Sequence, residues 1–225
     1  MTAIIYQPLL IIFQLIAVYF ASRFTKDELF YFFRSFIKKE KVVFALVSIF
    51  FLPGTILHEL SHFFAATVLM IKVHEVSVIP KLEKNYIKLG SVLYEKKDFV
   101  RGILIGLAPV SGAAFFFFIL SGFKLFPSSN LVLTIIYTYL IFTVSSTMFS
   151  SQQDLQDLIY IIPLITIIFG VIYILHINIS FAIPTTFING VLVFLAQINF
   201  YLLVSLAINF GLILLFGALR FIIKK

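Results

Sequence analysis

Long apolar stretches separated by short polar ones run along the whole chain. A helix needs about twenty apolar residues to cross the hydrocarbon core of a bilayer. By that measure the pattern predicts six spans. They lie at residues 3–22, about 43–71, about 102–122, about 131–150, about 158–176 and within the long run 188–221. We therefore expect an all-α polytopic membrane protein, multi-pass and most simply placed in the cell membrane.

Two of the polar segments carry patterns of their own. Residues 23–41 are charged but place Phe and Leu at helical spacing, which is typical of an interfacial amphipathic helix and equally of a solvated connector. Residues 72–101 contain two stretches, 73–79 and 87–94, that are rich in β-branched residues or alternate apolar and polar positions. We expect a small β-hairpin there, in the loop between spans two and three.

The second span is interrupted by Pro53 and Gly54, four residues before His58. Proline has no N–H to bond the preceding turn, so a helix bends where it occurs. The sequence predicts a kink that opens room beside the residues that follow.

Composition sets the class of protein. The chain is 61% hydrophobic and 12% charged, with no cysteine, which is too apolar for a soluble domain. Without cysteine, any metal must be bound by His, Asp or Glu. In 225 residues there is room for several spans and little else, so we expect one membrane-embedded domain over residues 1–225. Its partners should be the lipid bilayer and membrane proteins, with no nucleic acid.

The basic residues orient the chain by a narrow margin. With the N-terminus in the cytoplasm, the loop 72–101 (seven Lys and Arg) and the C-terminal tail (three) lie inside. The six of residues 23–41 and Lys124 then lie outside. Basic residues favour the cytoplasmic side, so the sequence predicts both ends of the chain inside.

Residues 58–62 read His-Glu-Leu-Ser-His, in the later half of the second span. Side chains four apart share one helix face, so His58 and His62 can bind the same metal ion. Glu59 is placed to act on a metal-bound water. The alternative is a pair of histidines hydrogen-bonded to neighbours, which would bury three ionisable groups in hydrocarbon without need. We therefore expect Zn²⁺.

A catalytic zinc site has three protein ligands and one open position for water. Val68 stands where another zinc-protease pattern has a third histidine, and His74 falls in the hairpin. His176 ends span five, which runs opposite to span two. Spans two and four run in the same direction, so Asp154 and Asp157, just beyond span four, approach the side on which the motif lies. Because Asp154 would emerge nearer the surface than the histidines, the preceding Ser-rich stretch is expected to turn inward under cover of protein.

The motif in a membrane helix, the hairpin-like loop and an aspartate about ninety residues on together resemble the site-2 protease family of intramembrane zinc metalloproteases. The resemblance covers roughly residues 42–158, the catalytic core. It implies that His58, His62 and Asp154 bind zinc, that Glu59 is the catalytic base, and that transmembrane segments of membrane proteins are the substrates. The chain departs from the family because no Asn-x-x-Pro precedes Asp154 and no glycine follows it, which leaves Asp157 open.

Residues 106–112 (GLAPVSG) resemble a small-residue stretch that packs against the catalytic helix in this family. Ser111 could contact a substrate backbone, although close packing by its Gly and Ala neighbours is the simpler interpretation.

Two other functions stay open. A zinc protease acting on prenylated or loop substrates would draw its third ligand from a later glutamate, and none occurs in spans three to six. A metal-binding transporter or an inactive scaffold could line a polar path with amide side chains of the last span, unless these make interhelical hydrogen bonds. They are Asn189, Gln197, Asn199 and Asn209.

Overall fold

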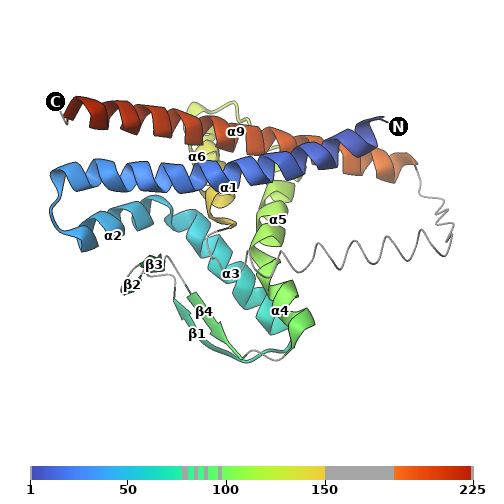
Figure 1. Ribbon diagram of the computed structural model, residues 1–225. Coiled ribbons are helices and arrows are strands. Elements are labelled where there is room, and N and C mark those ends of the chain that lie inside the picture. Colours follow the sequence, from blue (N-terminus) through green and yellow to red (C-terminus); the bar gives the residue numbers. More distant parts are fainter. Residues whose placement is uncertain are drawn as a thin grey trace.

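The computed structural model describes residues 2–77, 81–83, 86–88, 91–95, 98–149 and 185–223. This part of the chain is mainly helical (Figure 1). Its helices are α1 (Thr2–Phe36), α2 (Glu40–Phe50), α3 (Leu52–Val68), α4 (Phe99–Gly106), α5 (Ala108–Gly122), α6 (Leu131–Thr147) and α9 (Thr185–Ile223). Among the described helices, α1 and α9 are each long and apolar enough to cross a membrane. The bent pairs α2–α3 and α4–α5 bring the number of spans to four if each is one span. The helical class is as expected, whereas the fifth expected span (158–176) lies outside the described residues.

Helices α1 and α9 lie side by side along most of their length (Figure 1). Their contacts follow the same order on both helices, so the two run parallel. Gln14 Nε2 donates to the Asn199 carbonyl at 3.3 Å, Thr25 Oγ1 donates to Asn209 Oδ1 at 2.7 Å, and Arg220 donates to Glu28 at 3.0 Å. Two parallel helices that cross a bilayer end on the same side. For two such spans, the end of α9 would lie on the side opposite to the N-terminus, which differs from the expectation that both ends share one side.

Helix α1 continues through the charged segment 23–41 as far as Phe36. The sequence predicted a span ending near residue 22 and then a separate interfacial helix or connector. No Gly or Pro occurs between Pro8 and Phe36, so nothing in this stretch breaks the helix. Part of the apolar surface of the second half is covered by protein: Leu29 is buried, and the ring of Phe32 lies 4.8 Å from that of Phe216 in α9.

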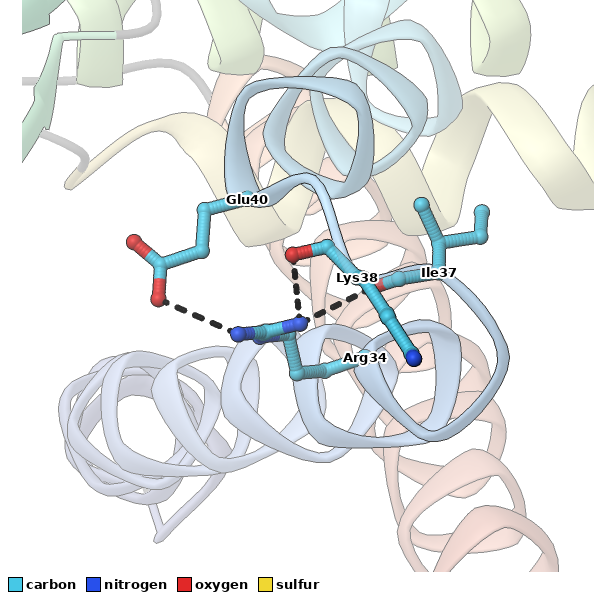
Figure 2. A network of polar contacts seen from close by, with 4 residues as sticks. All are labelled: Arg34, Ile37, Lys38 and Glu40. Carbon is cyan, nitrogen blue, oxygen red and sulfur yellow. Dashed lines mark hydrogen bonds and ion pairs between the residues drawn. The ribbon is translucent and has the colours of Figure 1, made fainter.

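Arg34 closes the turn between α1 and α2 (Figure 2). Its Nη1 donates to the carbonyls of Ile37, at 3.1 Å, and Lys38, at 2.7 Å, while Nη2 lies 3.6 Å from the carboxylate of Glu40. Carbonyls at a helix C-terminus have no donor within the helix, and Arg34 supplies one.

The expected kink before the motif is confirmed. Helices α2 and α3 meet at Phe51 with a bend of 75°. Pro53, in the first turn of α3, has no N–H for the carbonyl of Ile49. The carbonyl of Phe50 also leaves the helix pattern and accepts a hydrogen bond of 2.9 Å from the Tyr139 hydroxyl of α6. The bend directs α3 away from the α1–α9 pair (Figure 1).

The stretch expected to be one span at 102–122 is two helices. α4 and α5 meet at Leu107 with a bend of 43°. The cause is Pro109, in the first turn of α5. Asp98 caps the start of α4 by accepting a hydrogen bond of 2.8 Å from the Arg101 N–H.

The hairpin expected in the loop 72–101 is present, with one more strand pair than expected. Strand β1 (Val73–Ser77) pairs antiparallel with β4 (Ser91–Tyr94), and β2 (Lys81–Glu83) pairs antiparallel with β3 (Tyr86–Lys88). The stretch expected as one strand, 87–94, is thus shared between β3 and β4.

The main apolar core lies where α5 and α6 meet the α1–α9 pair. It is made of buried side chains from all four helices and from the residue that follows α6. They are Val18, Ala21, Ala113, Phe117, Leu120, Ile141, Val144, Met148, Tyr201, Leu202 and Leu206. α3 packs against α5 and α6 from the other side, which encloses the face that carries the motif.

Candidate metal site

The motif residues lie on the enclosed face of α3. His58 is 3% exposed, Glu59 4% and His62 7%. Burial of three neighbouring ionisable groups is costly unless each has a charged, polar or metal partner. The burial of these three side chains is what we expect of a functional cluster.

The two histidines converge on one point. Their Nε2 atoms are 3.2 Å apart, and the rings meet edge to face at 84°. Two nitrogens bound to one tetrahedral zinc at about 2.0–2.1 Å would be separated by about 3.3 Å. The observed separation therefore fits two ligands of a single ion. It also fits a hydrogen bond between two neutral imidazoles.

A backbone carbonyl fixes the ring of His62. Its Nδ1 lies 3.0 Å from the carbonyl oxygen of Ile105 in α4. A carbonyl can only accept, so Nδ1 carries the proton and Nε2 presents its lone pair toward His58. Metal-binding histidines are oriented in this way by a second hydrogen bond from the ring. In the alternative without metal, His58 Nε2 donates to His62 Nε2.

Pro109 explains why this carbonyl is available. In a continuous helix, the N–H of residue 109 would bond to the carbonyl four residues earlier, which is that of Ile105. Proline has no N–H, so Ile105 can accept from His62 instead. No role for Ile105 or Pro109 in orienting His62 was predicted from the sequence. The signal was present, because a proline inside an apolar helix frees one carbonyl.

Two glycines let neighbouring helices approach the motif helix. A Cβ on Gly112 of α5 would overlap the side chain of Ser61, which lies between the two histidines in sequence. A Cβ on Gly54 of α3 would overlap the backbone of Thr143 and the hydroxyl of Thr147, both in α6. The expectation that the 106–112 stretch packs against the motif helix is thus confirmed, and Ser111 is exposed.

The order of contacts with α6 also indicates the direction of α3. Phe50, the last residue of α2, meets Tyr139, and Gly54, in the first turn of α3, meets Thr143 and Thr147, later in α6. The two helices therefore run in the same direction, as the sequence predicted for spans two and four.

The expected third ligand cannot be placed. Asp154, Asp157 and His176 all lie outside the described residues. Within the described part of the chain, no group of three His, Cys, Asp or Glu side chains is arranged to hold a metal. His74 belongs to the hairpin, where its Nε2 lies 3.7 Å from the carboxylate of Glu95, and both side chains are about half exposed.

Two of the four amides that might line a polar path make interhelical hydrogen bonds. Asn199 of α9 donates to the Gln7 side chain of α1. Asn209 donates to Ser146 Oγ of α6 at 3.1 Å and accepts from Thr25 of α1. Helix association in lipid relies on bonds of this kind.

No protein-family model, curated protein or solved structure matches the chain.

Proposed function

We propose that the chain is an intramembrane zinc metalloprotease that hydrolyses peptide bonds in or near transmembrane segments of membrane-protein substrates. One observation carries the proposal: the Nε2 atoms of the buried residues His58 and His62 lie 3.2 Å apart. Glu59, which follows His58 in the sequence, is buried as well. The hydrogen bond from His62 to Ile105 supports it, because that bond leaves the lone pair of Nε2 for a metal ion.

Asp154 is proposed as the third ligand, and the packing of α3 against α6 supports this choice. Gly54 and Thr147 lie against each other, and the two helices run in the same direction. Seven residues after Gly54 the chain reaches Ser61, between the two histidines, and seven residues after Thr147 it reaches Asp154. Asp157 lies three residues farther along.

The residues present suit zinc, since imidazole and carboxylate are its usual ligands in a cysteine-free chain. A zinc ion held here would supply Lewis acidity to a water molecule and to the scissile carbonyl. Glu59 accepts the proton of that water and returns it to the leaving amine. The positions of His58 and His62 are fixed, because α4 and α5 pack against the helix α3 that carries them.

The hairpin is proposed to hold the substrate. A helical substrate has its carbonyls bonded internally, so it must be extended before cleavage. Four residues separate α3 from β1, and among the described strands β1 pairs only with β4. Its other edge can therefore receive an extended peptide as an additional strand. The protein is proposed to be multi-pass and to act in the cell membrane.

Glu59→Gln tests the proposal, because it keeps the shape of the side chain and removes the base. We expect cleavage of a transmembrane test substrate by purified protein to fall by at least about 100-fold, with zinc content unchanged. Glu40→Gln, at the exposed α1–α2 turn, is the matched control and should cleave normally. Full activity of Glu59→Gln contradicts the proposal. Zinc flux into vesicles that does not depend on Glu59 supports a transporter instead.

A further inference from the structure

Basic residues gather at one end of the α1–α9 pair. The turn after α1 carries Lys38 and Lys39, and Lys41 follows in the first turn of α2. α9 ends at Ile223 and is followed in sequence by two lysines, which lie outside the described residues. Because the helices are parallel, with Arg220 bonded to Glu28, the described end of α9 lies at the same end of the pair as this turn.

Two of the acidic residues near this end, Glu28 and Glu40, are already paired with arginines, and the exposed Asp27 lies farther back along α1. Glu40 pairs with Arg34 and Glu28 pairs with Arg220. Lys38, Lys39 and Lys41 are exposed, and no ion pair joins them to an acid of the described residues. Figure 2 shows the Lys38 carbonyl facing Arg34 while its ammonium group points away from the Arg34–Glu40 contact. The turn therefore presents uncompensated positive charge.

Apolar side chains stand beside these charges. Phe36 at the end of α1 is 63% exposed, Ile222 near the end of α9 is 67% exposed, and Val42 at the start of α2 is exposed as well. Lysines next to exposed apolar side chains at a helix end match the boundary between hydrocarbon and headgroups.

We propose that this basic end, with Lys38, Lys39 and Lys41, binds anionic phospholipid headgroups on the cytoplasmic face of the membrane. The cytoplasmic leaflet carries the negative surface potential that basic segments next to a span prefer. The parallel packing adds the three basic residues of the tail to the six of residues 23–41. The balance of charge that favoured a cytoplasmic N-terminus is thereby reversed, and the N-terminal end of α1 lies outside. This inference does not depend on the proposed proteolysis.

Lipid retention tests the binding. The full chain is taken from vesicles of equal phosphatidylcholine and phosphatidylglycerol, and the lipids that remain bound are counted by native mass spectrometry. We expect enrichment of phosphatidylglycerol that falls roughly tenfold in Lys38→Gln/Lys39→Gln and weakens in high salt. Lys72→Gln/Lys124→Gln removes two exposed lysines elsewhere and should retain the enrichment. Equal enrichment in both variants overturns the proposal.

Cysteine labelling tests the side of the membrane, since the chain has no cysteine of its own. Ser35→Cys places a thiol at the exposed end of α1 without changing its charge, and Tyr6→Cys places one near the other end. In intact cells, a membrane-impermeant maleimide should label the Tyr6→Cys protein, and Ser35→Cys only after permeabilisation. Labelling of Ser35→Cys in intact cells overturns the cytoplasmic placement.

Discussion

His62 Nδ1 lies 3.0 Å from the carbonyl oxygen of Ile105, which joins the motif helix α3 to the end of α4. The carbonyl can accept this bond because Pro109, four residues later, offers no N–H. The orientation of a candidate metal ligand therefore depends on the break between α4 and α5.

Pro109→Ala should weaken zinc binding. The new N–H competes with His62 for the Ile105 carbonyl, and the bend between α4 and α5 relaxes. Loss of such an orienting bond typically lowers metal affinity by about 10–100-fold. Competition with a chelator of known affinity measures the change. Pro8→Ala, inside α1 and remote from the motif, controls for removal of a helix proline, and equal affinity in both variants would contradict the role given to Pro109.

Gly54→Ala should destabilise the fold by about 1–3 kcal/mol, because the new methyl group overlaps the Thr143 backbone, which cannot rotate away. Gly211→Ala meets open space inside α9, so it should be neutral or should stabilise by up to about 1 kcal/mol through helix propensity. Thermal unfolding in detergent compares the two. Equal midpoints would show that α3 does not pack against α6 as closely as described.

Asp154→Asn should reduce bound zinc far more than Asp157→Asn, because a neutral amide is a poor zinc ligand and the number of residues in the sequence after the Gly54–Thr147 contact favours Asp154. Zinc per chain, measured by elemental analysis after dialysis, separates the two variants. The opposite order would assign the ligand to Asp157, and full retention in both would remove aspartate from the site.

Asn209→Leu should cost about 1 kcal/mol of stability, because it removes the bonds to Ser146 and Thr25 that join α9 to α6 and α1. Asn189→Leu changes an exposed amide on the same helix and should have little effect. Unfolding in detergent measures both. If Asn209 instead served a polar path, its replacement would block zinc flux and leave stability unchanged.

Local sequence was sufficient for features that depend on neighbouring residues. Pro53 predicted the kink before His58, and the four-residue spacing predicted that His58 and His62 share one helix face. The β-branched residues predicted the hairpin in which β1 pairs with β4. The common direction of α3 and α6 followed from counting spans. These expectations needed only the covalent geometry of the chain and the alternation of crossings.

Features that depend on contacts between distant segments could not be predicted. Thr25 meets Asn209, 184 residues later, and nothing near either residue indicates that α1 and α9 run parallel. The same pairing packs α9 against the second half of α1, where Leu29 is buried, and α1 continues to Phe36 without a break near residue 22. The sequence shows that Pro109 frees the Ile105 carbonyl. That this carbonyl bonds to His62 could not be predicted, because it depends on α4 lying beside α3.

X-ray absorption at the zinc edge of the purified, zinc-loaded protein shows whether His58 and His62 share one metal ion. We expect one zinc per chain, surrounded by nitrogen and oxygen donors at about 2.0–2.1 Å, with the outer-shell scattering of two imidazoles. We also expect His62→Ala to remove the imidazole signal of one ring. Absence of stoichiometric zinc, or a zinc spectrum that His58→Ala and His62→Ala leave unchanged, would contradict this expectation.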